Sequence, residues 1–387
     1  MMDTPPPIIY APAVPAPPPV VASGASIVPS PRSTAIIVAY GAQGASCGGV
    51  DVPFAINEPP LPTGATRYEP VSPANTQPPR PASDIVLSFH IDAQGRAVGI
   101  KREAATPSGP TLYVDSSDLE PALAVSRFAS GRPRLDCRAT YRATTVPLAD
   151  ADPQLLSAYM ASGTAGSGAR QELARLRPTG TNCGSPEALR PLLLAFPDPK
   201  KVGLRSGEVV YATIAFDVDA SGKPINVRSL ASNNAAHAAE GARAVGASRF
   251  AKGPAVGCIT GGALRGQNPT EPPPRPDVAS FRRSADTCSE VKPKMQFALK
   301  PAFPLPFRKR NVEGWAIVRY DVAPWGDTGN IEVVAAEPAA VFGEVAKQVV
   351  RSGKAEASAT GATGCLAPVA FRLADDDGRP EAGVAFR

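Results

Sequence analysis

The chain has 387 residues, which is too long for one small core and indicates two to three domains. Its 45 prolines and 34 glycines make up about a fifth of the residues, whereas these two residue types usually contribute roughly 12%. Much of the chain is therefore expected to be linker or turn. The formal net charge of +5 is spread thinly and no apolar run approaches ~18 residues, which argues against a nucleic-acid-binding stripe and a membrane-spanning segment.

Residues 1–40 are predicted to form a proline-rich, disordered segment. Nine prolines fall in residues 1–30, and nine more fall in residues 53–81. Such composition favours an extended, polyproline-like backbone. The N-terminus has no basic stretch followed by an unbroken apolar helix, so no secretion signal is expected in the sequence as given.

One strand–turn–strand pattern then occurs three times in the sequence. Its copies occupy residues 85–100, 211–227 and 315–333. In the first two copies an aspartate opens a tight turn and a glycine that can take a positive φ closes it, and these turn residues are Asp92 with Gly95 and Asp219 with Gly222. The third turn is expected to be longer, to run from Ala323 and to end at Gly329.

Each hairpin is followed by a helical pattern and a final strand that a cysteine opens. The helix starts are expected at Ser116 or Ser117, at Asn233 or Asn234, and at Pro338 in the first turn of the third helix. The tripeptide Ser-Arg-Phe closes the first two helices. The predicted fold class is therefore α+β, with three tandem ββαβ modules.

The three modules are placed at residues 41–150, 180–266 and 286–375, and are called units 1, 2 and 3 below. The other ranges are a linker with short helices at 151–179, a proline-rich linker at 267–285 and a tail at 376–387. The basic tripeptide at 308–310 is interpreted as part of a solvated turn.

Six cysteines fall two to a unit, on either side of each hairpin and helix. Six cysteines allow fifteen pairings. The repeat selects one of them, because equivalent positions should make equivalent contacts: Cys47 with Cys137, Cys183 with Cys258, and Cys288 with Cys365. Closing a loop of ~75 residues stabilises a small unit by roughly 4 to 5 kcal/mol in the chain-entropy model, and disulfides indicate an oxidising compartment.

Cysteine and histidine side chains can also bind metals or catalyse reactions. Zinc sites favour close Cys/His pairs, which are absent from the sequence. A nucleophilic cysteine requires a histidine, and His90 and His237 are the two in the chain. Both are interpreted as structural or exposed, so no catalytic residue, cofactor site or metal site is predicted.

The repeated unit resembles the C-terminal domain of TonB. The resemblance is carried by "LSFHIDAQGRAVGI … ALAVSRF" and "IAFDVDASGKPINV … AVGASRF", which cover the hairpin and helix of units 1 and 2. In that family the domain lies in the periplasm and contacts outer-membrane receptors by adding a strand to its sheet through backbone hydrogen bonds. A proline-rich spacer, as in this chain, precedes the domain there.

The resemblance implies a protein of the periplasm or cell envelope that binds a protein or peptide, with a segment of an outer-membrane receptor as a possible partner in transport. The chain departs from the family because it has three units and no anchoring helix, and this weakens energy transduction as its role. The alternative is a structural envelope scaffold whose modules self-associate or bind peptidoglycan. An enzyme is the third hypothesis, but the P-loop, G-x-S-x-G and H-E-x-x-H motifs are absent.

Overall fold

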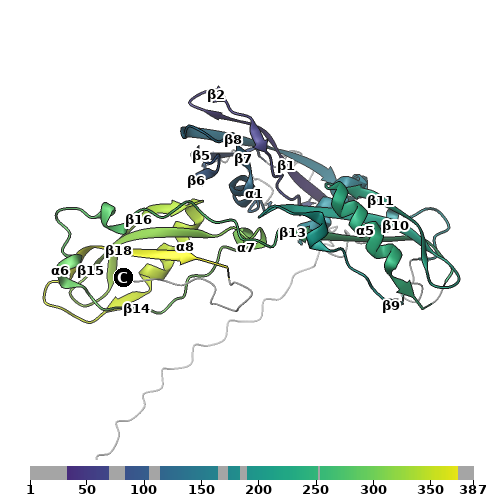
Figure 1. Cartoon of the computed structure of the whole chain (residues 1–387). Coiled ribbons are helices and arrows are strands. Elements are labelled where there is room, and N and C mark those ends of the chain that lie inside the picture. Colours follow the sequence, from purple (N-terminus) through teal and green to yellow (C-terminus); the bar gives the residue numbers. More distant parts are fainter. Residues whose placement is uncertain are drawn as a thin grey trace, which may run out of the picture.

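The computed structural model describes residues 33–68, 83–103, 114–163, 173–183, 190–251 and 253–373. They form a mixed α+β structure with a separate sheet in each unit (Figure 1). Residues 1–32 of the predicted proline-rich segment and the predicted tail at 376–387 lie outside the described residues. Within the described ranges, no helix is long and apolar enough to cross a membrane.

Unit 1 contains one large antiparallel sheet in the order β2-β1-β8-β5-β6, with β4 also paired to β1. Its elements are β1 (Ser33–Cys47), β2 (Val50–Asp51), β3 (Phe54–Ile56), β4 (Thr63–Tyr68), β5 (Ile85–Ile91), β6 (Ala97–Arg102), α1 (Leu119–Val125), β7 (Arg127–Phe128) and β8 (Arg134–Pro147). The buried side chains of β5 are Leu87, Phe89 and Ile91, the apolar set of the alternating pattern.

Units 2 and 3 have smaller sheets, in the orders β11-β10-β13 and β16-β15-β18. Unit 2 contains β9 (Pro191–Leu193), α4 (Pro199–Val202), β10 (Val209–Val218), β11 (Pro224–Ser232), α5 (Ala235–Ala247), β12 (Arg249–Phe250) and β13 (Ala255–Arg265). Unit 3 contains α6 (Cys288–Val291), β14 (Met295–Phe297), α7 (Leu305–Lys309), β15 (Gly314–Val322), β16 (Thr328–Glu337), α8 (Ala340–Arg351), β17 (Gly353–Ala355) and β18 (Ala362–Phe371). The 3₁₀ helix η1 (Leu148–Asp150) ends unit 1, and the helix α2 (Pro153–Ala161) and the 3₁₀ helix η2 (Val278–Phe281) lie between units.

Each unit also has a short two-stranded ladder that the sequence did not reveal: β3 with β7, β9 with β12, and β14 with β17. The serine at the end of each main helix supports the segment that follows the first of these strands. The hydroxyl groups of Ser126, Ser248 and Ser352 accept the backbone N–H groups of Glu58, Ala195 and Leu299 at 3.0 to 3.1 Å. The three contacts are equivalent, and they align Glu58, Ala195 and Leu299 between the units.

The hairpin turns require a correction in unit 3. Gly95 and Gly222 have φ values of 77° and 81°, as expected for the glycine that closes the turn. In the third hairpin the corresponding residue is Gly326, with a φ of 99° and an N–H that donates to Ala323. Gly329 instead lies inside β16, opposite Asp321, so the third turn is as short as the other two.

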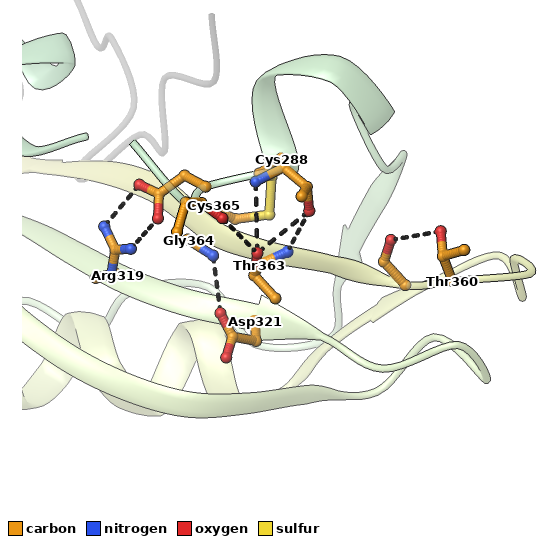
Figure 2. Close-up of a disulfide and its surroundings, with 11 residues drawn as sticks. Cys288, Arg319, Asp321, Thr360, Thr363, Gly364 and Cys365 are labelled. Carbon is orange, nitrogen blue, oxygen red and sulfur yellow. Dashed lines mark hydrogen bonds and ion pairs between the residues drawn. A yellow bond between two sulfur atoms is a disulfide. The ribbon is translucent and has the colours of Figure 1, made fainter. Parts of the chain in front are cut away.

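The structure contains the three expected disulfides, Cys47–Cys137, Cys183–Cys258 and Cys288–Cys365, and has no free cysteine among the described residues. Figure 2 shows the unit 3 disulfide, whose Cys365 lies inside β18 and does not open it as the sequence predicted, because β18 already begins at Ala362. Beside it, the N–H of Gly364 donates to Asp321 at 2.8 Å. Gly257 and Asp217 make the same bond in unit 2 at 2.8 Å. Three disulfides are typical of a protein that folds in an oxidising compartment.

The three units pack against one another instead of forming separate beads. Figure 1 shows α7 at the centre of the molecule, where the chain approaches α1. Arg310, directly after α7, is 1% exposed and bonds to Asp118 and Glu58 of unit 1 and to the carbonyl of Gly207 in unit 2. The interpretation of residues 308–310 as a solvated turn is therefore wrong for Arg310.

Two further expectations need correction. β1 begins at Ser33 and belongs to the unit 1 sheet, so the boundary at residue 40 was placed too late. Helix α1 begins after Asp118 without a side-chain cap, whereas Ser116 and Ser117 precede it. In α5 the expected cap holds, because the Asn234 side chain accepts the N–H of His237.

Candidate functional site: the last strand of unit 2

The two repeated aspartates stabilise the hairpin turns that they begin. The carboxylate of Asp92 accepts the N–H groups of Gln94 and Arg96, and that of Asp219 accepts those of Ser221 and Lys223. Their geometry is that of turn-forming residues. Among the described residues, no group of three or more His, Cys, Asp or Glu side chains is arranged to hold a metal ion.

The units differ most at their last strands, β8, β13 and β18. In unit 1 the strand β1 covers the outer side of β8 and pairs with it antiparallel, with Ile36 opposite Pro147 and Cys47 opposite Cys137. β1 is apolar and places the buried side chains of Val38 and Tyr40 in the unit 1 core. The edge of unit 1 is thus completed by a strand from the same chain.

In unit 3 the last strand carries a proline, Pro368, opposite Ile317. Proline has no N–H, so within a sheet it occupies an edge strand with its nitrogen turned away from the neighbouring strand. The residues on either side, Ala367 and Val369, are fully buried. This edge therefore lacks a donor at its middle and is shielded from solvent.

In unit 2 the start of the last strand is covered, because Asn182 accepts the N–H of Val256 and Thr181 donates to its carbonyl, both at 2.7 Å, but the described residues leave the middle of the strand unpaired. β13 pairs with β10, and the described residues provide no strand on its other side. Thr260, Gly261 and Gly262 are exposed at the middle of β13. Gly261 occupies the place of Pro368, because each lies three residues after the disulfide cysteine of its strand. By the same register its N–H points outward, and it is a donor that unit 3 lacks.

An apolar cavity of about 540 Å³ lies beside this edge, between β13, α5 and the segment around residues 191–197. Ligand sites in proteins commonly measure ~300–1,000 Å³. The cavity exists because unit 2 has small or displaced side chains where its siblings have large ones. Gly262 stands where unit 1 has the fully buried Tyr141, and Leu264 stands where unit 3 has Phe371.

The segment at the cavity mouth shows the same contrast. The tripeptide Ala-Phe-Pro occurs in units 2 and 3, at Ala195 and at Ala302. In unit 3, Phe303 packs edge-on against Phe342 and Phe371 and fills the space between helix and sheet. In unit 2 the tripeptide lies three residues closer to the serine contact, because Ala195 itself donates to Ser248 whereas Leu299 donates to Ser352 in unit 3, and its Phe196 is 74% exposed. Phe196 and the exposed Leu194 line the cavity from this segment, and the neighbouring Leu192 and Leu193 are also exposed.

His237 lines the cavity from α5, at the place of Phe342 in unit 3. It is 2% exposed, and its Nε2 lies 3.4 Å from the Gly262 carbonyl. Burial lowers the pKa of His237, so the ring is neutral at neutral pH. His237 thus adds a weakly polar ring to the otherwise mainly apolar lining of the cavity. His90 lies exposed on β5, away from this site.

The sequence placed the six cysteines and the turn residues of units 1 and 2, but it did not single out unit 2 as the site. The signal that could have done so is the pair Gly261-Gly262 in the strand that follows Cys258, where glycine is unfavourable without a close approach or a missing neighbour. Comparison with protein-family models gives no match for this chain, and comparison with curated proteins gives none either.

Proposed function

We propose that the chain is a TonB-C-like binding protein of the periplasm or cell envelope, and that unit 2 binds an extended peptide segment of a partner protein. The segment adds to the outer edge of β13 as a further antiparallel strand. Backbone hydrogen bonds supply affinity in this mode, and pockets for alternate side chains supply specificity.

The observation that supports the proposal is the contrast among three equivalent strands. The edge of β8 is occupied by β1 and the edge of β18 is interrupted by Pro368, whereas the part of the chain that the structure describes leaves the exposed middle of the β13 edge unpaired. Exposed edges are usually blunted because they invite unwanted pairing. An edge that is left open in one unit and closed in the other two is consistent with a role in binding a partner strand. The pairing of β1 with β8 shows that this fold accepts a strand at the same position.

The experiment uses the intact, oxidised chain and random peptides displayed on phage. Peptides selected on the wild-type protein are tested against Gly261→Pro, which copies the residue of unit 3, and against Gly261→Ala as the matched control. Binding should persist with alanine and fall at least about tenfold with proline, which removes the outward N–H. Selected peptides that bind all three proteins equally would overturn the proposal.

An open edge also permits pairing with β13 of a second molecule, which is how a self-associating scaffold would use it. Sedimentation of the intact chain separates the two roles. A monomer that binds selected peptides supports peptide capture, whereas a dimer that Gly261→Pro dissociates supports the scaffold.

A further inference from the structure

The cavity beside β13 has a direct consequence for which peptide fits. In unit 1, Tyr141 of β8 lies opposite Ala42 of β1. Tyr141 fills the space between sheet and helix, and the added strand contributes a small residue there. In unit 2, Gly262 replaces that tyrosine. The ring is therefore missing from the unit 2 core.

The face on which this residue acts follows from the strand alternation. Cys258, Thr260, Gly262 and Leu264 share one face of β13. It is the face of the disulfide core and of α5, because Cys258 packs with Phe216 and Phe250. Ala263 is on the other face and packs with α2 residues such as Ala158. A side chain opposite Gly262 on an added strand therefore points toward the cavity.

The space to be filled matches aromatic rings. The sibling units fill it with Tyr141 in unit 1 and with Phe303, Phe342 and Phe371 in unit 3. Aromatic side chains opposite glycine in antiparallel pairs cover the exposed backbone and contribute beyond area burial. A Cβ atom placed on Gly262 would meet no atom within 4 Å, so the space directly beside this glycine is open.

We propose that unit 2 selects peptides with an aromatic residue at the position that pairs with Gly262, so that the ring enters the cavity between β13 and α5. This inference rests on the proposed strand addition and specifies its partner: an extended, mainly apolar segment with one obligatory aromatic residue. Unit 1 shows the complementary solution, with the aromatic ring on the receiving strand and alanine on the added one.

The test uses two peptides taken from β1, Thr34 to Ser46, one with the natural Ala42 and one with Ala42→Phe. The β8 edge of unit 1 is filled by β1 of the same chain, and binding that Gly261→Pro weakens is assigned to the β13 edge of unit 2. Wild-type protein should bind the phenylalanine peptide at least about tenfold more tightly, from burial of one ring. Binding is measured by fluorescence anisotropy of labelled peptides.

The matched protein variant is Gly262→Tyr, which gives β13 the residue of unit 1. It should lose the preference and bind the Ala42 peptide at least as well as the phenylalanine peptide. Gly246→Ala, a substitution in α5 where no atom lies within 4 Å, should bind like the wild type. Far-ultraviolet circular dichroism confirms that each variant is folded.

The outcomes separate the two proposals. Equal affinity of the two peptides for the wild type, with binding still lost in Gly261→Pro, would overturn the aromatic preference and leave strand addition intact. Binding of either peptide that Gly261→Pro does not weaken would overturn strand addition itself. A preference for phenylalanine that survives Gly262→Tyr would also overturn the inference, since the ring would then bind elsewhere.

Discussion

Replacement of Arg310 by methionine should destabilise the protein strongly, because this guanidinium joins the three units. Its Nε and Nη2 donate to the two carboxylate oxygens of Asp118 at 2.7 and 2.6 Å, and its Nη1 donates to Glu58 at 3.2 Å. The carbonyls of Pro59 and Gly207 accept the remaining N–H groups at 3.0 and 3.4 Å.

The magnitude follows from what the substitution leaves behind. Glu58 is buried, and burial raises the pKa of Glu58 while Arg310 opposes that rise. Without Arg310 its partners are the N–H of Val209 at 3.0 Å and Arg205 at 3.4 Å. Removing one member of a buried ion pair costs about 3–5 kcal/mol. The free energy of unfolding should fall by that amount.

The assay is urea denaturation followed by circular dichroism and by the fluorescence of Trp315, whose indole donates to Pro273 at 2.7 Å in unit 3. Lys309→Ala, an exposed neighbour, is the matched control and should change stability by less than about 0.5 kcal/mol. The triple variant Arg310→Met, Glu58→Gln, Asp118→Asn should recover part of the loss. An Arg310→Met protein as stable as the Lys309→Ala control would refute the reasoning.

Other predictions concern pH, a turn and a disulfide. Burial raises the pKa of Glu337 to about 7, so the native state keeps a proton that the unfolded chain releases. The free energy of unfolding should therefore fall as pH rises from about 4.5 to 7, by at most about 3 kcal/mol. In Glu337→Gln this part of the pH dependence should vanish. Gly326→Ala should lower the melting temperature by several degrees, because the new carbon would lie 2.0 Å from a carbonyl oxygen at a positive φ, whereas Gly329→Ala should have little effect; equal effects would contradict the corrected turn. Replacing Cys183 and Cys258 by serine should destabilise unit 2 by about 2–5 kcal/mol, and urea denaturation that shows no loss would contradict a stabilising role.

The covalent frame and the hairpins could be predicted because they depend on local or repeated signals. Asp92 and Gly95 recur as Asp219 and Gly222, and a turn of this type requires those residue types. The third turn was misplaced because Gly326 and Gly329 both follow Pro324, and the sequence alone does not say which one must take a positive φ.

The candidate site could not be predicted because it is defined by what other parts of the chain leave uncovered. Gly262 is informative only when Tyr141 is known to occupy the same place, and that equivalence depends on strand register. The contacts of Arg310 between units could not be predicted either, because its carboxylate partners, Glu58 and Asp118, are far away in the sequence from the basic tripeptide.

Hydrogen exchange along β13 tests strand addition most directly. The intact protein is compared with and without the β1-derived peptide that carries Ala42→Phe. The account predicts slower exchange at the amides of Ile259, Gly261 and Ala263, which face the open edge, and no change in β18. Protection confined to other elements, or unchanged exchange at saturating peptide, would contradict it.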